Sequence, residues 1–402
     1  MPTAPFRPEP FTSSTDPTEL DDLRRRLRAT RWPRTPADAG WAEGVDLTAL
    51  RTLVEYWAND FDWAATEARL NELPRFRATL GLGAGSGVDA DSGAGPDSGE
   101  GTEPGTIGIH YVHVRAASGA HPLPLILTHG WPDSFWRYSK VIELLTDPAA
   151  HGGDPEDAFD VIVPDMPGYG YSDQPVEALN SRDVAALWTQ LMTGLGYERF
   201  AAAGGDIGSH VSRYVALDEP SRVVAVHRMD AGLPFPSIDP ADLSAPEREW
   251  LAGAAAWGAS EGAYAAMHRT KPLTAAVGLT DSPAGLAAWI LEKLHAWTDT
   301  DLTLDDVLTN LSIYWFTGTI GSSMRMYRAN AAIPPAQLAR RVEVPSGFSI
   351  FDHDIVRAPR EWLDRSANTV SVTHPPHGGH FAPLEQPARY ADELRTFFRP
   401  YR

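Results

Sequence analysis

A carboxylate stands at the centre of the glycine-rich segment GGDIGS at 204–209, as Asp206. A short apolar run at 200–203 precedes it, and helical spacing follows at 210–217. Small residues around a central residue suit a strained strand-to-helix turn that presents a nucleophile, because larger neighbours would clash there. A carboxylate at this apex attacks electrophilic carbon, as in an epoxide or an alkyl halide, and forms an alkyl ester. An aspartate before a helix is also a common N-cap, so this pattern alone leaves a structural role open.

An ester on Asp206 must be hydrolysed, which requires a base to activate water and an acid to orient that base. His380 lies in the glycine loop HGGHF after the last expected strand, and we predict that it is the base. Asp354 follows the preceding expected strand and is the candidate acid, although Asp352 lies close enough in sequence to compete.

The motif HGWP at 129–132 follows an early apolar strand and is the candidate oxyanion-binding turn. Two backbone N–H groups are needed to hold the oxygen of the ester intermediate. In this layout the amides of Trp131 and Ile207 are the candidates, and Pro132 would fix the turn. A plain surface loop is the alternative.

These residues are positioned by strands that alternate with helices. That alternation predicts a mostly parallel sheet covered on both faces, with ligands bound at the carboxyl ends of its strands. Each motif above follows an expected strand. The expected strands are 109–114, 123–128, 159–163, 200–203, 223–226, 347–351 and 369–372.

The chain divides into four parts by composition and periodicity. A helical N-terminal region spans 1–106 and includes aromatic helices up to about 78, whose tryptophans we expect to pack onto another part of the chain. Within it, 81–106 is rich in Gly, Ser and Asp, which predicts a mobile surface loop, with an interdomain linker as the alternative. The α/β core spans 107–231 and 339–402, and helical spacing at 254–267, 283–297 and 303–328 predicts an inserted cap over 232–338.

Composition excludes several classes of function. The 402 residues carry a formal net charge of -19, which argues against nucleic-acid and anionic-membrane partners. The absence of cysteine rules out disulfides, thiolate catalysis and cysteine-based zinc sites. His374, His377 and His380 could suggest a metal cluster, but no acidic residue joins them locally, so we expect no metal. Without a leader or a long apolar span, we expect a soluble cytoplasmic protein with no membrane anchor.

Several motifs occur in an order that is typical of one family. They are HGWPDS, DMPGYGYSD, GGDIGS, EGAYAAMHRTKP, DSPAGLAAWILEKLHAWTD, SSMRMYR, GFSIFDHD and HGGHFAPLEQP. Together with the opening PFRPEPF, they resemble the α/β-hydrolase-fold epoxide hydrolases of the microsomal and juvenile-hormone type. The resemblance covers the chain except the glycine-rich insertion. It implies an α/β-hydrolase fold, an N-terminal domain, a cofactor-independent activity, and an epoxide and water as the partners of the reaction.

By the same resemblance, Asp206 is the nucleophile, His380 the base and Asp354 the acid, at a position where microsomal members have Glu. Tyr264 and Tyr327 match the two cap tyrosines, whose phenols can stabilise an epoxide oxygen as the ring opens. Without the family, both tyrosines would be taken for packing residues. The chain also departs from the family at Ile207, where members usually have Trp.

The substrate follows less directly from the sequence. An aromatic pocket suited to a hydrophobic epoxide, aryl epoxides included, is expected from Trp131, Phe135, Trp136, Trp289 and Trp315. Detoxification and tailoring of a secondary metabolite both fit such a substrate, and a homo-oligomer is compatible with the sequence. The alternatives are a haloalkane dehalogenase on the same scaffold, which would need side-chain donors for a halide, and a non-catalytic binding protein.

Overall fold

The computed structural model describes residues 6–34, 36, 39–83, 105–119, 121–231, 238–355 and 357–402. Most of the segment predicted to be a mobile loop therefore lies outside the described residues, at 84–104. Within the described part, no helix is long and apolar enough to cross a membrane.

One nine-stranded sheet forms the centre of the described chain, in the order β1-β2-β3-β5-β4-β6-β7-β8-β9. Every neighbouring pair in the run β5-β4-β6-β7-β8-β9 is parallel. Every neighbouring pair in the run β1-β2-β3-β5, at one edge of the sheet, is antiparallel. The strands are β1 (Glu9–Pro10), β2 (Arg75–Gly81), β3 (Thr106–Val114), β4 (Leu123–Thr128), β5 (Phe159–Pro164), β6 (Phe200–Gly204), β7 (Val223–Arg228), β8 (Val342–Ser349) and β9 (Ala367–Thr373). The α/β class predicted from the sequence is confirmed.

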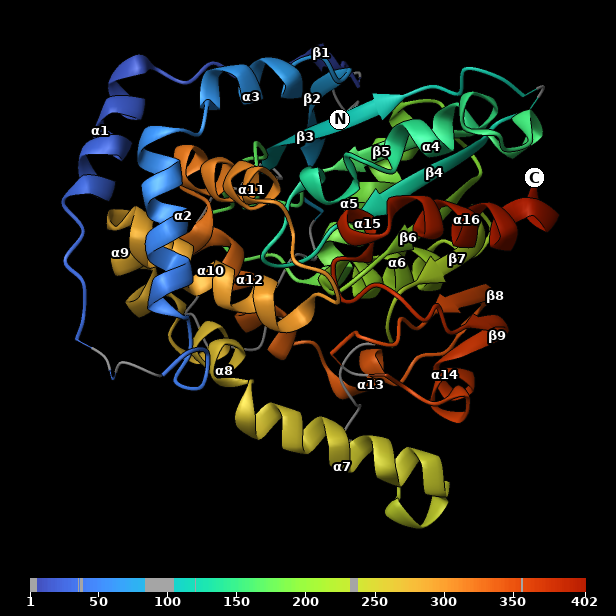
Figure 1. Cartoon of the computed structure of the whole chain (residues 1–402). Coiled ribbons are helices and arrows are strands. Elements are labelled where there is room, and N and C mark those ends of the chain that lie inside the picture. Colours follow the sequence, from blue (N-terminus) through green and yellow to red (C-terminus); the bar gives the residue numbers. More distant parts are fainter. Residues whose placement is uncertain are drawn as a thin grey trace, which may run out of the picture.

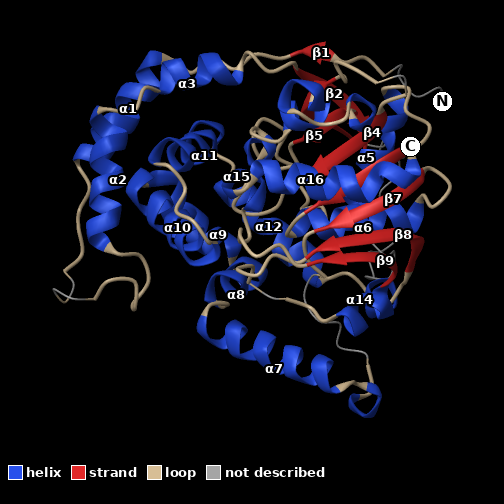
Figure 2. Ribbon diagram, turned by 45° about the vertical axis from the view of Figure 1, so that its right-hand side comes forward, coloured by secondary structure: helices blue, strands red, loops and turns tan. Residues whose placement is uncertain are grey.

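Helices cover both faces of this sheet (Figures 1 and 2). Helices α5 (Ser181–Gly194) and α6 (Ile207–Asp218) pack against each other on one face, and α4 (Ile142–Thr146) and α16 (Pro387–Phe398) do so on the other. The central strands are short apolar runs that are buried on both sides, as parallel sheets require. Helices α14 (Arg360–Ser366), α15 (Ala382–Glu385) and α13 (Pro335–Leu338) complete the C-terminal part.

The cap lies beyond the carboxyl ends of the parallel strands, toward which the arrowheads point in Figure 2. Its helices are α7 (Ala245–Ser260), α8 (Ala263–Thr270), α9 (Pro272–Asp281), α10 (Pro283–Trp297), α11 (Leu304–Thr317) and α12 (Ile320–Ala331). Two helices expected to be continuous are interrupted. Gly262 separates α7 from α8, and Gly318, with a φ of 65°, ends α11 in the left-handed conformation that terminates many helices.

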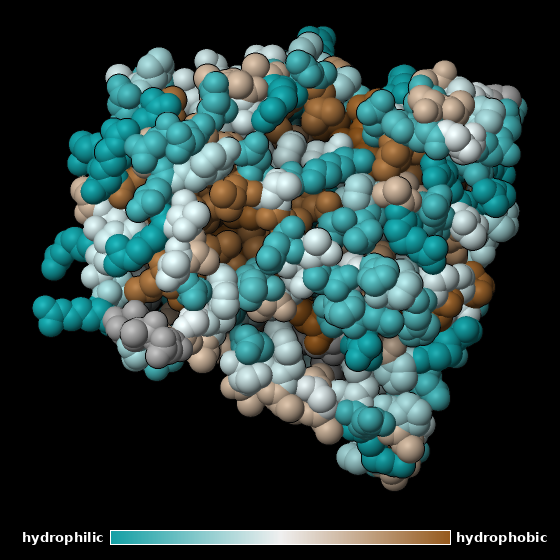
Figure 3. All heavy atoms as spheres, viewed as in Figure 1, coloured by the Kyte–Doolittle hydropathy of each residue, from teal (hydrophilic) through white to brown (hydrophobic). Residues whose placement is uncertain are grey.

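The N-terminal helices α1 (Pro17–Arg28), α2 (Leu47–Asn59) and α3 (Trp63–Leu70) pack on the cap. The Trp57 indole N–H donates to Ser312 over 3.1 Å, and the Trp63 ring stacks on Phe316 with centroids 5.2 Å apart. The expectation that these tryptophans pack onto another part of the chain is confirmed. Seen from outside, the face in Figure 3 is mostly hydrophilic, and hydrophobic groups gather in the hollows beside α2.

The region at 1–106 is not only helical. Strands β1 and β2 extend the main sheet, and β2 pairs with β3 over its whole length, from Arg75 opposite Val112 to Gly81 opposite Thr106. The alternation of polar and apolar residues in β2 is typical of a strand with one buried face, and the helical prediction up to about residue 78 was wrong at this point. The N-terminal region is therefore joined to the core through the sheet as well as to the cap.

Candidate active site

Asp206 occupies the turn between β6 and α6, where its backbone has a φ of 56° and a ψ of -130°. It is the one non-glycine residue with positive φ among those described, a conformation that costs about 1–3 kcal/mol and persists where the surroundings impose it. The close approach of β4 explains the glycines, because a Cβ on Gly208 would lie 2.0 Å from the Thr128 carbonyl oxygen. The turn therefore presents the Asp206 side chain at the end of β6.

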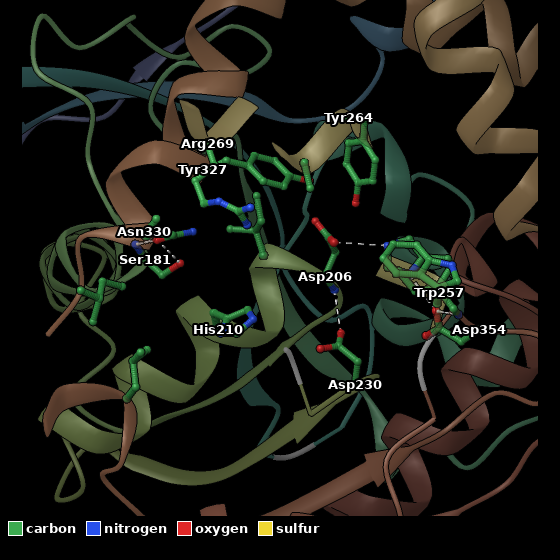
Figure 4. A pocket seen from close by; sticks show the side chains of 17 residues that line it. Ser181, Asp206, His210, Asp230, Trp257, Tyr264, Arg269, Tyr327, Asn330 and Asp354 are labelled. Carbon is green, nitrogen blue, oxygen red and sulfur yellow. Dashed lines mark hydrogen bonds and ion pairs between the residues drawn. The ribbon is translucent and has the colours of Figure 1, made fainter. Parts of the chain in front are cut away.

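The carboxylate of Asp206 faces a cavity of about 280 Å³ between the sheet and the cap (Figure 4). Six of the residues singled out from the sequence line it, namely Asp206, Ile207, Tyr264, Tyr327, Asp354 and His380. The rest of the wall is largely apolar. It includes Trp257, Ala265, Ala331, Ile333, Leu338 and Ile355, with Ser181, His210, Asp230, Arg269 and Asn330 as its polar members.

His380 links the two carboxylates. Its Nε2 lies 3.4 Å from Asp206 Oδ2, and its Nδ1 lies 2.8 Å from Asp354 Oδ1. The His380 and Asp354 side chains are only 2% and 3% exposed, and Asp206 is 14% exposed toward the cavity. His380 is held from behind, since its backbone N–H donates to the Trp297 carbonyl over 2.8 Å and its own carbonyl accepts from Arg137.

Asp352, the competing acid, is exposed and lies 3.7 Å from Arg357. We expect Asp354→Asn to lower kcat by about 10³-fold, because the imidazole would lose the partner that orients it and stabilises its charge. Asp352→Asn should stay within about twofold of the wild type. Steady-state kinetics on both variants decide the assignment, and a severe loss in Asp352→Asn with an active Asp354→Asn would reverse it.

The charges in this site depend on one another. Burial alone would lower the pKa of His380, but the Asp354 and Asp206 carboxylates outweigh it and raise that pKa to about 10. Burial would raise the pKa of Asp206, yet the hydrogen bond and charge of His380 and the amides of Trp131 and Ile207 bring it to about 2. The resting site therefore holds a carboxylate next to an imidazolium.

This coupling makes a pH prediction. Because the folded pKa of His380 is raised, the stability it contributes is fully present below the ordinary value of 6.5 and is lost as pH rises through about 10.

Asp206→Asn removes one of the two carboxylates that raise this pKa, so His380 should titrate at lower pH in the variant. An NMR titration of the imidazole nitrogens checks this, and an unchanged midpoint would show that Asp206 does not hold the proton on His380.

Two backbone amides face the Asp206 carboxylate, those of Trp131 and Ile207. The Trp131 N–H donates to Asp206 Oδ1 over 2.8 Å, and the next bond, Trp131–Pro132, is cis. His129 holds this loop, because its Nδ1 bonds to the Gly130 carbonyl over 2.9 Å and its Nε2 accepts from the Met166 amide over 3.1 Å. Both donors expected from the sequence thus lie at the carboxylate.

The two cap tyrosines face Asp206 from the opposite wall (Figure 4). Tyr264 belongs to α8 and Tyr327 to α12, and their ring centroids are 6.0 Å apart. Tyr264 stacks on Trp131, with 5.3 Å between centroids. Burial, followed by the nearby Asp206 charge, raises the pKa of Tyr264. Burial, then Tyr264 and Asp206, raises that of Tyr327, so both phenols keep their protons at neutral pH.

None of the five aromatic residues expected around the substrate is among those that line the cavity. Phe135 is fully buried behind it and packs edge-on against His110, and Trp136 belongs to the same short helical turn. The Trp289 indole N–H donates to His268 over 3.1 Å, and Trp315 lies on the outer side of the cap near Arg26. Trp131 contributes its amide and supports Tyr264. Aromatic content alone did not show which face of each element these side chains occupy.

Several residues that the sequence did not single out lie at the site, among them Asp230, Trp257 and Trp297. Asp230 follows β7, lines the cavity and accepts the Asp206 backbone N–H over 2.8 Å. Burial raises its pKa, and the Asp354 and Asp206 charges add to the effect, although Arg228 opposes it. Its place after a parallel strand was a usable signal. Trp257 and Trp297 belong to cap helices, and nothing in the sequence distinguishes them from packing residues.

Comparison with known proteins shows which family the chain that carries this site belongs to. Residues 8–138 match the family model described as the N terminus of epoxide hydrolases, and residues 124–278 match that of the alpha/beta hydrolase fold. A protein of Stigmatella aurantiaca that is named, by inference, an epoxide hydrolase is 39% identical over 98% of this chain and 85% of its own. The chain belongs to the epoxide hydrolases.

Two further relatives agree with this assignment. Epoxide hydrolase 1 of Oryctolagus cuniculus is 32% identical over 96% of this chain and 88% of its own length. The solved structure of the Aspergillus niger epoxide hydrolase matches with a TM-score of 0.82 and 30% identity, covering 98% of this chain and 97% of the other. The family and fold that the motifs led us to expect are confirmed, and the protein is a hydrolase of this family.

Proposed function

We propose that this epoxide hydrolase converts a hydrophobic epoxide into a vicinal diol through an ester on Asp206. The observation that carries the proposal is the facing arrangement of a carboxylate, a histidine between two carboxylates, and two phenols around one cavity. The apolar side chains of the wall favour a hydrophobic substrate. The Trp257 ring supplies one aromatic surface for an aryl group.

The first step is ring opening. Asp206 Oδ2 attacks an epoxide carbon from the side opposite the C–O bond, so a new C–O ester bond forms as the ring bond breaks. The epoxide oxygen gains negative charge and takes a proton from a phenol, Tyr264 or Tyr327, which becomes a phenolate. Because these donors face the nucleophile across the cavity, they stabilise charge where it develops.

The second step is hydrolysis of the ester. Once Asp206 is esterified it has no charge, and one of the two carboxylates that hold the proton on His380 is lost. The pKa of His380 then falls and its proton passes through solvent to the phenolate, so that the neutral imidazole can take a proton from water while Asp354 stabilises the resulting cation. Hydroxide adds to the ester carbonyl, whose oxyanion the Trp131 and Ile207 amides stabilise. The intermediate then collapses: the C–O bond to the alkoxide breaks, the alkoxide takes the proton of the added hydroxyl and leaves as the diol, and Asp206 is again a carboxylate beside the imidazolium.

Phenylalanine substitutions test the role of the tyrosines. We expect Tyr264→Phe and Tyr327→Phe each to slow ester formation by about 10- to 100-fold, because each loses one general acid or hydrogen-bond donor. The double variant should lose more than about 10³-fold. Rapid-quench measurement of the ester separates this step from hydrolysis, whose rate should stay within a few-fold. Equal slowing of both steps would contradict the assignment.

Product analysis tests the proposed reaction itself. The enzyme is incubated with styrene oxide and with aliphatic 1,2-epoxides of increasing length, and the products are separated by chromatography. We expect diols from the hydrophobic epoxides and no halide release from 1-bromohexane, which serves as the control for a dehalogenase. Halide release without diol formation would replace the proposal by the dehalogenase alternative.

A further inference from the structure

A buried lysine lies behind one of the two cap tyrosines. Lys293 belongs to α10 and is 5% exposed. Its Nζ is 4.9 Å from the ring centroid of Tyr264 and 5.9 Å from that of Trp297. It is not among the residues that line the cavity, and the two reaction steps above do not use it. Burial of an ammonium is costly, so its place next to a reacting phenol calls for an explanation.

The other groups around Tyr264 define what this cation does. Lys293 pairs with Glu292, its sequence neighbour, over 2.5 Å, and that carboxylate is 23% exposed. His268 packs edge-on against Tyr264, and burial, aided by Lys293, lowers its pKa to about 3, so it is neutral. Asp206 lies in front of the phenol and Tyr327 beside it. Among the described residues that contact the Tyr264 ring, Lys293 supplies the positive charge.

We propose that Lys293 is a positioning residue that acts through Tyr264 and promotes transfer of the Tyr264 proton to the epoxide oxygen during ring opening. This inference rests on the proposed function, in which a cap phenol is the proton donor. When the O–H bond breaks, its electron pair stays on Tyr264 and the negative charge spreads into the ring. A cation near the ring stabilises this phenolate more than the neutral phenol, so the contact strengthens as the reaction proceeds.

The loss of negative charge on Asp206 during ester formation also favours a phenolate on Tyr264. In the resting site the Asp206 carboxylate disfavours a second negative charge on Tyr264. As the ester forms, that charge disappears while the charge on the phenol grows. Lys293 then lies next to two anions, the phenolate and its partly exposed partner Glu292.

A purely structural role for the Lys293–Glu292 pair is the competing explanation, and the two make different predictions. If the pair only holds α10 in place, then Lys293→Met and Glu292→Gln should slow ring opening by similar factors. If the ammonium stabilises the phenolate, Lys293→Met should slow ring opening, whereas Glu292→Gln, which leaves the ammonium without its neutralising partner, should not. Lys293→Arg keeps the charge and should restore most of the rate.

The experiment measures ester formation and ester hydrolysis separately by rapid quench and mass spectrometry, with styrene oxide as substrate. We expect Lys293→Met and Lys293→Gln to slow ester formation by about 10-fold or more, with hydrolysis within about threefold of wild type. Lys140→Met, which breaks an ion pair with Asp306 outside the cavity, is the matched control. Lys293→Gln and Lys293→Arg keep the test informative if the Met variant does not fold.

A double-mutant cycle decides whether Lys293 acts through Tyr264. In a Tyr264→Phe background, Lys293→Met should cause no further slowing, because there is no phenolate left to stabilise. The inference is overturned if the two effects multiply, if Glu292→Gln is as slow as Lys293→Met, or if ester formation is unchanged in Lys293→Met. Failure of the proposed function would look different, since no ester on Asp206 would form even in the wild type.

Discussion

Replacement of His380 by glutamine should stop the enzyme after ring opening. Loss of His380 would raise the pKa of Asp206, but the Trp131 and Ile207 amides would still stabilise its carboxylate, so Asp206 would still attack the epoxide. Without a base the ester is not hydrolysed, and protein with the mass of one added epoxide should accumulate. Intact-protein mass spectrometry after mixing with styrene oxide measures this, and peptide mapping should place the adduct on Asp206.

The matched control is His374→Gln, since His374 is an exposed histidine of the same C-terminal loop region. This variant should turn over at close to the wild-type rate and show no lasting adduct. Accumulation of a covalent species on any other residue would contradict the proposed order of events. So would steady turnover by His380→Gln at more than about a hundredth of the wild-type rate.

Removal of the nucleophile is expected to have the second large effect. Asp206→Ala should lower kcat by at least about 10⁴-fold, because water would have to attack the epoxide without the covalent step. No adduct should form, even when His380 is also replaced. Circular dichroism and thermal unfolding establish that the variant is folded, and Asp301→Asn, at a side chain that is 88% exposed, is the control.

An Asp206→Ala variant that keeps more than about a tenth of the activity would show that the turn does not carry the nucleophile. Partial activity in Asp206→Asn is a weaker contradiction, because an asparagine side chain can be hydrolysed to aspartate. Mass spectrometry of the recovered protein distinguishes reversion, which adds about 1 Da, from true activity of the variant.

Much of this fold was predictable because its signals are local. The parallel strands are short apolar runs, and the motifs with glycine, proline and acidic residues follow β4, β5 and β6. Glycines around Asp206 were informative for a physical reason, since a Cβ on Gly130, in the loop after β4, would lie 2.2 Å from Asp206 Oδ1. The family resemblance then supplied the roles of Tyr264 and Tyr327, which the residues alone did not indicate.

The remaining features depend on contacts between distant segments. Strand β2 carries the polar and apolar alternation of a strand, but its pairing with β3 across the glycine-rich segment is not a local feature. The side chains of Trp289 and Trp315 sit on cap helices whose orientation no local pattern fixes, and neither reaches the cavity wall. The sequence did not single out Lys293 for the same reason. Its contact with Tyr264 depends on the distance between α10 and α8, which only tertiary packing sets.

The central claim, a covalent ester on Asp206, is tested most directly by the source of the oxygen in the product. The wild-type enzyme in excess reacts once with styrene oxide in oxygen-18 water, and the peptide that contains Asp206 is then analysed by mass spectrometry. We expect heavy oxygen in the Asp206 carboxylate and an unlabelled diol from this first turnover, because water attacks the ester carbonyl. A labelled diol with unlabelled Asp206 would mean that water opens the epoxide directly and would contradict the account.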